Sequence, residues 1–226
     1  MPSTKKTVLI TGSTRGIGLA LATLYTKAGW NVIGTARATS NADKLAALSP
    51  FKIVTLDTSD EDSVNEAPRQ LKDVPIDLLI NNAGTGWLTE IVAPTKASLV
   101  KPFEVNAVGL FLVTNALQSN LQLAAKLNGF ASVVQLSSLL GSLSSNTDKN
   151  TVFFRGQYAY STSKAALNMI TRSLAVDLRD SNIAVVAVHP GYVDTVLTGP
   201  RSIEIRGHTG KFLNADPTMP GAELPW

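Results

Sequence analysis

The sequence predicts an α/β fold: a doubly wound parallel sheet with helices on both faces. Short strand-like runs alternate with helix-like segments, and the strand-like runs are apolar at successive positions rather than at every second one. Strands of this kind have to be covered on both faces, as in a parallel sheet with crossover helices. The chain has 226 residues, of which 44% are hydrophobic, so we expect one domain over residues 1–226, with a variable part from about residue 196.

The first half of the chain alternates strands and helices in the order that such a fold requires. "TVLIT" is a short β-branched run that ends at a glycine, which is typical of a buried strand. "GIGLALATLYTKAG" follows as a helix that stops at Gly29. The other elements predicted here are strands at 30–37, 51–57 and 76–84, a short helix near 45–49, and a helix over 60–74 that Pro68 interrupts.

The second half contains two long predicted helices, over 100–127 and 161–179. Both are apolar over more than one face, which exceeds what is needed to cover a sheet. The strands predicted around them are 131–138, 183–191 and 210–214.

A glycine-rich loop joins the first predicted strand to the first predicted helix. In "TGSTRGIG" the glycines let backbone N–H groups approach a pyrophosphate, and the helix N-terminus supplies the positive end of a dipole. The spacing G-x-x-x-G-x-G differs from the usual G-x-G-x-x-G, but the strand–loop–helix context is the one that a dinucleotide site needs. The predicted cofactor-binding residues of this loop are Gly12, Thr14, Arg15, Gly16, Ile17 and Gly18.

The end of the second predicted strand indicates which dinucleotide binds. A carboxylate at this place bonds the ribose 2′-OH of NAD, whereas an arginine accommodates the 2′-phosphate of NADP. The sequence has Ala36 and Arg37 there, and Arg15 in the glycine loop is a second candidate partner. Because arginine pairs with phosphate through two parallel hydrogen bonds, we predict NADP(H) in preference to NAD(H). The alternative is that both arginines are solvated surface charges.

Polar residues end the third and fourth predicted strands, at the edge where open α/β sheets bind ligands. Asp57 can accept a hydrogen bond from an adenine amino group, or it can cap the next helix. "NNAG" supplies Asn82, Ala83 and Gly84, which either contact the cofactor or form a turn.

A tyrosine and a lysine are paired in "QYAYSTSKAALN". Lys164 lies four residues after Tyr160 and so on the same helical face, whereas Tyr158 points to another face. A free tyrosine has a pKa near ~10, so about three pKa units, or roughly 4 kcal/mol, separate it from proton transfer near neutral pH. A unit charge ~4 Å away at an effective dielectric constant of ~20 contributes about that much. We therefore expect Lys164 to lower the pKa of Tyr160 and make it an acid–base group.

Six motifs follow one another in an order that resembles the short-chain dehydrogenase/reductase family. They are "TGSTRGIG", "NNAG", "VNAVG", "LSS", "YSTSK" and "HPGYVDT", and the resemblance covers roughly residues 5 to 198. It implies a Rossmann-like fold and looks most like the small NADPH-dependent carbonyl reductases, including fungal ketoreductases. The activity implied is hydride transfer from the nicotinamide to the carbonyl carbon of a small ketone or aldehyde.

The resemblance also implies a role for each motif residue. Tyr160 would be the general acid, Ser138 would hydrogen-bond the substrate carbonyl, and Lys164 would additionally hold the nicotinamide ribose. Asn106 would keep a water in a proton relay behind Lys164. The remaining cofactor contacts implied are Pro190, Gly191, Val193 and Thr195.

Composition argues against several other kinds of site. The chain has no cysteine, which excludes disulfides, thiol nucleophiles and cysteine metal sites. The two histidines are far apart, so no metal site is expected; His189 is interpreted as structural and His208 as exposed. A net charge of +3 without runs of like charge gives little support for nucleic-acid binding. No apolar run approaches ~18 residues, so we expect no membrane partner and a cytoplasmic location.

Two departures from the family pattern leave alternatives open. The stretch between "SSLLGS" and Tyr160 is longer than usual, and Phe153 and Phe154 either line a substrate pocket or pack this loop. After Thr195 the chain reaches its last predicted strand quickly, so the preceding helix is missing or reduced to a turn near "RSIEIRG". The same residues could therefore serve a dehydratase or isomerase, or a nucleotide-binding regulatory protein with little activity.

The extra apolar surface of the two long helices needs a partner. The family resemblance implies one, because family members commonly pair these helices across a two-fold axis. We therefore expect a homodimer. A tetramer is possible but less expected, because the other common interface uses the helix that is expected to be missing or reduced to a turn here. The alternative is a monomer in which the loop at 139–155 covers the apolar residues.

Overall fold

A seven-stranded parallel sheet organises the chain in a computed structural model that describes residues 5–86, 93–191, 206–216 and 221–226. The strand order is β3-β2-β1-β4-β5-β6-β7, and each neighbouring pair is parallel. The order reverses between β1 and β4, which creates a ligand-binding crevice at the carboxyl ends of the strands. The strands are β1 Thr7–Ile10, β2 Asn31–Ala36, β3 Lys52–Thr55, β4 Leu78–Asn81, β5 Ala131–Leu136, β6 Ile183–His189 and β7 Phe212–Asn214.

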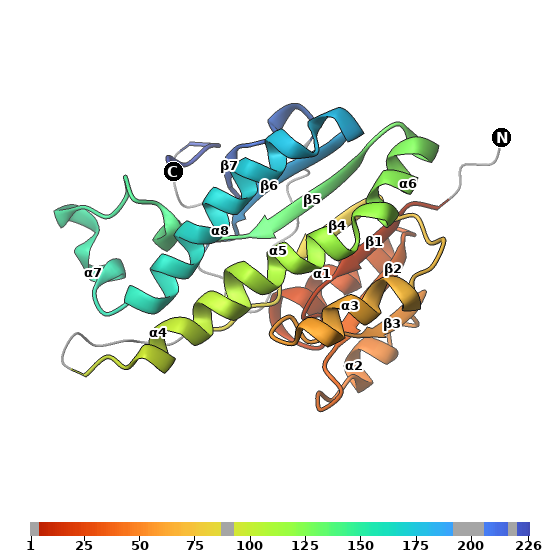
Figure 1. The fold of residues 1–226 in the computed structure, drawn as a ribbon, viewed down its shortest axis with the longest axis horizontal. Coiled ribbons are helices and arrows are strands. Elements are labelled where there is room, and N and C mark those ends of the chain that lie inside the picture. Colours follow the sequence, from red (N-terminus) through yellow and green to blue (C-terminus); the bar gives the residue numbers. More distant parts are fainter. Residues whose placement is uncertain (1–4, 87–92, 192–205, 217–220) are drawn as a thin grey trace.

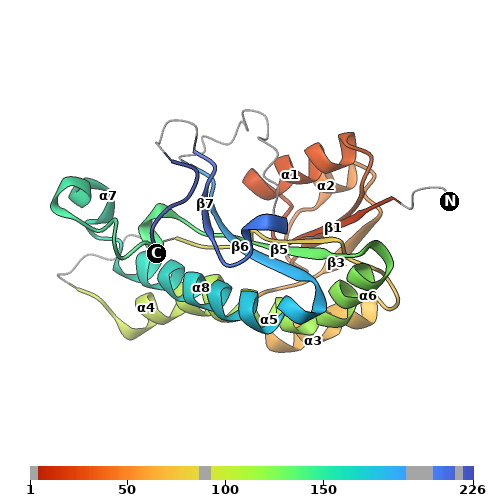
Figure 2. The same ribbon diagram turned by 90° about the horizontal axis from the view of Figure 1, so that it is seen from above.

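Helices cover both faces of this sheet, as the sequence predicts (Figures 1 and 2). On one face lie α1 (Gly16–Lys27) and α2 (Asp43–Ala46). The other face is covered by α3 (Glu61–Gln70), α4 (Lys96–Phe103), α5 (Gly109–Ala116), α6 (Gln118–Asn128) and α8 (Tyr158–Asp177). A short helix that the sequence did not predict, α7 (Thr151–Phe154), projects beside the first turns of α8.

Two hydrophobic cores alternate along the same strands, one for each face of the sheet. On β1, Leu9 packs into the core beneath α3, α5, α6 and α8, whereas Val8 and Ile10 pack into the core beneath α1 and α2. Successive side chains of a strand point to opposite faces, so a strand buried on both faces has to be apolar at every position.

The long helix predicted over 100–127 is interrupted. A π-helical turn, Glu104–Val108, joins α4 to α5, and a break at Leu117 (φ −91°, ψ 9°) separates α5 from α6. Such π-helical turns inside α-helices are frequent at functional sites. The prediction of one continuous helix was wrong, because uniform apolar composition does not reveal where the hydrogen-bond register changes.

The helical run Lys96–Ala116 is long and apolar enough to cross a membrane by length and composition alone. Core helices meet the same criterion, and this run packs against α8 and α3. It also carries the buried polar residues Asn106 and Thr114, both of which are hydrogen-bonded to protein partners. One side of this helical run is therefore packed against the rest of the protein.

The described end of the chain contains the predicted last strand, β7. Within residues 206–216 and 221–226, one 3₁₀ turn at Arg206–His208 precedes this strand. Residues 221–226 then fold back along β7, with an antiparallel bridge between Leu213 and Glu223. This short strap lies along the β7 edge of the sheet.

Candidate active site

The glycine loop has the backbone geometry of a phosphate cradle. Gly12 is left-handed (φ +65°), and a Cβ there would lie 3.0 Å from Ala83 Cα. A Cβ at Gly18 would lie 2.3 Å from the Gly12 carbonyl oxygen, so only glycine permits this packing of α1 on the loop. Helix α1 has no side-chain cap and no acidic residue in its first turn. Its N-terminus therefore fits the pyrophosphate of a dinucleotide.

Thr11 and Asn82 fasten this loop to the loop after β4. The Asn82 amide nitrogen donates to the carbonyl oxygens of Thr11 (2.8 Å) and Gly12 (3.1 Å). The Thr11 hydroxyl accepts from the backbone N–H groups of Asn82 and Ala83, both at 2.9 Å. "NNAG" is thus a structural connection between two loops that both face the crevice. Thr11 was not singled out from the sequence, although it directly precedes Gly12.

Two exposed arginines follow the neighbouring strands β1 and β2 at the same edge of the sheet. Arg15 is in the glycine loop and Arg37 directly follows β2, and neither forms an ion pair within the part of the chain that the structure describes. Arginine side chains are donors that pair well with phosphate groups.

Asp57 is engaged in a local turn. Its Oδ1 accepts from the backbone N–H (2.9 Å) and the hydroxyl (2.7 Å) of Ser59. The following helix is capped by Asp60, which accepts from the backbone N–H groups of Asp62 and Ser63. Asp57 is therefore not the helix cap, and it remains a predicted contact for the adenine.

Ser138, Tyr160 and Lys164 come together from two elements. Ser138 follows β5, whereas Tyr160 and Lys164 lie four residues apart on α8. The Ser138 hydroxyl hydrogen-bonds the Tyr160 phenol. The Lys164 ammonium lies 5.7 Å from the centroid of the Tyr160 ring. The i, i+4 pairing predicted from the sequence thus brings the two side chains together. The ammonium lies over the ring of Tyr160.

Burial controls the pKa values of this pair. Burial raises the pKa of Tyr160, and the hydrogen bond with Ser138 opposes that rise. Burial lowers the pKa of Lys164 to about 8. The expected lowering of the Tyr160 pKa by Lys164 is not found, because desolvation dominates at the phenol. The lysine Nζ is directed at the main-chain oxygen of Leu136, 2.7 Å away.

Asn106 lies in the π-helical turn and is fully buried. Its amide nitrogen donates to the Thr85 carbonyl oxygen (2.8 Å) and the Ser163 hydroxyl (3.0 Å), and its Oδ1 accepts from Thr85 N–H (2.8 Å). Asn106 therefore connects the segment after "NNAG" to α8. Its partner on α8, Ser163, is the residue directly before Lys164. Thr85 and Ser163 are partners that the motif pattern alone did not identify.

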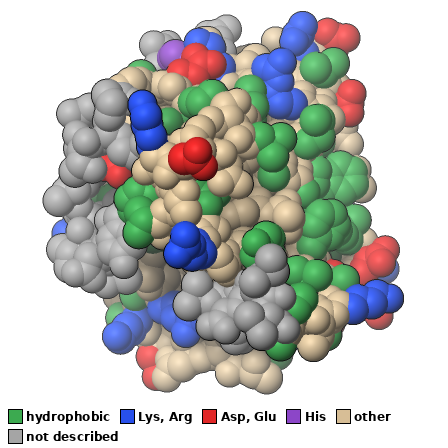
Figure 3. Space-filling view, turned by 90° about the vertical axis from the view of Figure 1, so that its left-hand side faces the viewer, with side chains coloured by type: hydrophobic (Ala, Val, Ile, Leu, Met, Phe, Trp, Pro, Cys, Tyr) green, Lys and Arg blue, Asp and Glu red, His purple; other side chains and the backbone are tan. Residues whose placement is uncertain are grey.

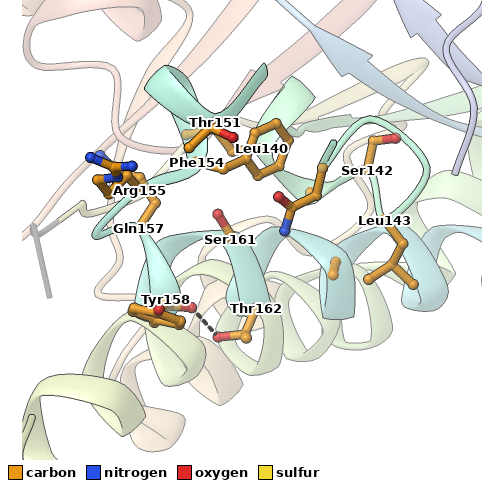
Figure 4. A pocket seen from close by; sticks show the side chains of 13 residues that line it. Leu140, Ser142, Leu143, Thr151, Phe154, Arg155, Gln157, Tyr158, Ser161 and Thr162 are labelled. Carbon is orange, nitrogen blue, oxygen red and sulfur yellow. Dashed lines mark hydrogen bonds between the residues drawn. The ribbon is translucent and has the colours of Figure 1, made fainter. Parts of the chain in front are cut away.

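A cavity of about 360 Å³ opens on a different face of α8 (Figure 4). Tyr158, Ser161, Thr162 and Ala165 of α8 form one wall. Phe154 lines this cavity, whereas Phe153 is exposed, so the two phenylalanines have different environments. Tyr158 is thus a cavity-wall residue. Tyr160, Ser138 and Lys164 do not line this cavity.

The segment after β6 is described only as far as Gly191. Gly191 is left-handed (φ +85°) and packs against Asp216, and Pro190 precedes it. The predicted cofactor contacts Val193 and Thr195 lie outside the described residues. His189 is buried with its pKa lowered by burial, which agrees with a structural histidine. His208 is half-buried, not exposed as expected, because it lies in the turn that leads into β7.

The sequence is similar to a known protein family and to several of its relatives. A model of the short chain dehydrogenase family matches residues 6–205. The chain is 36% identical over 209 residues to a 3-oxoacyl-acyl-carrier-protein reductase of Aquifex aeolicus, covering 89% of this chain and 79% of that protein. It is also 36% identical over 169 residues to a protein named C-signal of Myxococcus xanthus, covering 67% and 93%.

Solved structures of carbonyl reductases superpose over nearly the whole chain. The NADPH-bound carbonyl reductase from chicken fatty liver gives a TM-score of 0.84 at 28% identity, covering 98% of this chain and 94% of that one. Carbonyl reductase Sniffer of D. melanogaster gives 0.80 at 29% identity, covering 99% and 100%. With its Rossmann-like sheet, its glycine loop and a family model that spans most of its length, the chain belongs to the short-chain dehydrogenase/reductase family.

Proposed function

We propose that this protein is an NADPH-dependent carbonyl reductase that converts a ketone or aldehyde to an alcohol. The observation that carries the proposal is the meeting of Ser138, Tyr160 and Lys164 beside a glycine loop of phosphate-cradle geometry. A hydrogen-bond donor, a proton donor and a cation in one crevice are the groups that carbonyl reduction needs.

The protonation states favour the reducing direction. A phenol with a raised pKa is fully protonated at neutral pH, so Tyr160 is set to donate a proton to the carbonyl oxygen. Ser138 holds that oxygen through its hydroxyl, and Lys164 supplies positive charge behind the phenol. The nicotinamide, when bound, supplies the hydride that the carbonyl carbon accepts. Asn106 holds the neighbouring segment in place through Thr85 and Ser163.

NADPH is proposed over NADH on the strength of Arg15 and Arg37. Both side chains are exposed at the carboxyl edge of β1 and β2, and β2 is followed by arginine where NAD sites carry a carboxylate. The NADPH-bound state of the chicken carbonyl reductase supports the same choice. The remaining proposed cofactor contacts are Thr14, Ile17, Asp57, Ala83, Gly84, Pro190, Gly191, Val193 and Thr195.

We further propose a homodimer in which α4, α5 and α8 form the interface. Several large apolar side chains are exposed on these helices, and the loop at 139–155 does not cover them in the structure. The loop carries exposed apolar residues of its own. The apolar residues exposed on the three helices and the intervening π-helical turn include Leu99, Val100, Phe103, Val108, Phe111, Met169 and Val176.

A second candidate function is nucleotide binding with little turnover. One relative is named C-signal, which gives a reason to test this candidate. A reductase and a nucleotide-binding protein should both bind NADPH. The measurement that distinguishes them is therefore the consumption of NADPH in the presence of a carbonyl substrate.

Each reaction contains the purified protein, NADPH and one carbonyl compound, and the loss of NADPH absorbance is followed. The compounds are aromatic ketones, quinones, aldehydes and a 3-oxoacyl thioester. A carbonyl reductase should give substrate-dependent consumption and an alcohol product detectable by mass spectrometry. Tight NADPH binding without consumption on any carbonyl would reject the reductase and favour the binding protein. In a parallel incubation with a 3-hydroxyacyl thioester, conversion without net NADPH loss would indicate dehydration or isomerisation.

A further inference from the structure

We propose that Trp226 is a positioning residue for the candidate active site, acting through the turn that follows Ser138. The catalytic part of this inference rests on the proposed carbonyl reductase function, whereas the structural coupling does not. A series of contacts connects the strap at 221–226 to the Ser138 hydroxyl.

The strap is held along the edge strand β7 by main-chain hydrogen bonds. Asn214 N–H donates to the Ala222 carbonyl oxygen (3.0 Å), and Leu224 N–H donates to the Phe212 carbonyl oxygen (2.8 Å). Backbone pairing of this kind fixes the path of the strap whatever its side chains are. The last side chain, Trp226, is therefore delivered to a defined place.

The Trp226 indole is held between β7 and α8. It stacks on Phe212 with ring centroids 5.4 Å apart, and the Arg172 guanidinium lies 5.8 Å from its ring centroid. Arg172 is itself fixed by a hydrogen bond to the Gly210 carbonyl oxygen (2.7 Å). Aromatic stacking and a cation over the ring are both attractive, so together they can hold the strap in one position.

Trp226 in turn holds the loop that follows Ser138. Its main-chain oxygen accepts from both the backbone N–H (3.2 Å) and the hydroxyl (3.0 Å) of Ser144. Leu139 packs beside Trp226 against a small core cluster that contains Phe212 and Leu224. Leu139, at the start of the turn Leu139–Gly141, and Ser144, shortly after it, are thus both in contact with the strap.

The opposite side of the same turn rests on α8. A Cβ on Gly141 would lie 2.9 Å from Lys164 Cβ, and the Gly141 carbonyl oxygen accepts from the Asn168 amide nitrogen (3.0 Å). Within the turn, Leu140 N–H donates to the Ser138 hydroxyl oxygen at 3.2 Å. The hydroxyl that hydrogen-bonds Tyr160 is therefore oriented by a turn that is held on one side by α8 and on the other by Trp226.

The experiment compares Trp226→Ala and Trp226→Phe with the parent, and Trp30→Ala serves as the matched control. Trp30 also has an aromatic neighbour, Tyr25, and a lysine 5.8 Å from its ring, but it directly precedes β2, at the opposite end of the sheet. Two readouts are used: hydrogen exchange of the amides at 139–146, and kcat and KM for carbonyl reduction together with NADPH affinity.

Trp226→Ala should accelerate exchange at 139–146 and lower kcat by about 10- to 100-fold, the scale of a roughly 1 Å misplacement of a reacting group. NADPH affinity should be unchanged, and Trp226→Phe should restore most of the rate because it keeps the stacking. Trp30→Ala should leave the 139–146 exchange and kcat at parent values.

Unchanged exchange at 139–146 in a folded Trp226→Ala protein overturns the inference, as does a loss that Trp30→Ala reproduces. If Trp226→Ala does not fold, Ser144→Ala replaces it: this variant deletes one of the two bonds to Trp226 and should accelerate exchange in the same segment. Parent-like exchange in Ser144→Ala then overturns the inference. If the parent reduces no carbonyl, the proposed function fails, and the exchange readout still decides the coupling.

Discussion

The Nζ atom of Lys164 donates a hydrogen bond to the main-chain oxygen of Leu136 at 2.7 Å, and the lysine is only 4% exposed. The residue that the sequence pairs with Tyr160 is thus also a cation inserted between α8 and the end of β5. Burial lowers its pKa to about 8, which means that the folded protein holds this proton less tightly than the unfolded chain does.

Replacing this lysine should stabilise the protein. The pKa falls from 10.5 to about 8, a difference of about 2.5 units that corresponds to at most about 3 kcal/mol near neutral pH. Lys164→Met removes that penalty but leaves the Leu136 carbonyl oxygen without its donor, at a cost of about 1–2 kcal/mol. We therefore expect Lys164→Met to raise the free energy of unfolding by about 1–2 kcal/mol at pH 7 while abolishing carbonyl reduction.

The pH dependence gives this prediction its sign. Between pH 8 and 10.5 Lys164 binds protons more fully in the unfolded chain than in the folded one, so its contribution to the unfolding free energy should rise with pH across this window. Below pH 8 the full penalty is present. Urea unfolding at several pH values should show the advantage of Lys164→Met shrinking above pH 8. The exposed Lys126, replaced by methionine, serves as the control; a parallel shift in that variant would contradict the assignment.

The two arginines should select NADPH. Arg37→Ala should weaken NADPH binding by roughly 1.5–3 kcal/mol, the scale of a charge-assisted hydrogen bond, and should leave NADH binding nearly unchanged. Arg15→Ala should act in the same direction. Titration of both cofactors measures the effect, and Arg179→Ala, an exposed arginine at the amino end of β6, is the matched control. Equal affinities of the parent for NADPH and NADH would sink the cofactor assignment.

Tyr160→Phe should abolish carbonyl reduction and leave NADPH binding nearly intact. The substitution removes the transferable proton and the hydrogen bond with Ser138, but it changes little volume. Tyr158→Phe is the control because Tyr158 is half exposed and lines the cavity on another face of α8. Initial rates of NADPH consumption decide between them. If Tyr160→Phe kept most of the activity, the proton donor would have to be another group.

The strands and the motif loops could be predicted from the sequence because their signals are local. Each strand is a short apolar run, and the glycines of the cradle sit in the strand–loop–helix context that requires them. The pairing of Tyr160 with Lys164 is also local, since helical periodicity alone puts both on one face. Ser138 could be added only through the resemblance of "LSS" to the family motif.

Features that depend on tertiary packing could not be predicted in the same way. The π-helical turn at Asn106 is stabilised by Thr85 and Ser163, which are distant in sequence. The direction of the Tyr160 pKa shift was predicted wrongly because the sequence shows the neighbouring charge but not the depth of burial. The position of Trp226 could not be predicted either, since it depends on contacts with Ser144 and Arg172 of other elements.

Apolar side chains gather along the right of the face shown in Figure 3. This side of the molecule is the front of Figure 1, where α4 and α8 lie. Phe111 on α5 and Met169 on α8 remain 40% and 67% exposed. An exposed patch of this kind, presented by a pair of helices, suits a symmetric interface in which each subunit covers the other.

The proposed dimer should therefore dissociate when charged residues are introduced into this patch. A lysine at the interface would be buried without a partner in each subunit, so Phe111→Lys combined with Met169→Lys should shift the protein from dimer to monomer at micromolar concentration. Sedimentation measures the mass directly. Val152→Lys is the matched control, because Val152 is 79% exposed on α7, outside the proposed interface. A parent protein that sediments as a monomer would refute the pairing. A parent tetramer would show that a second interface forms despite the short segment before β7, and the double variant should then yield the dimer that this second interface holds together.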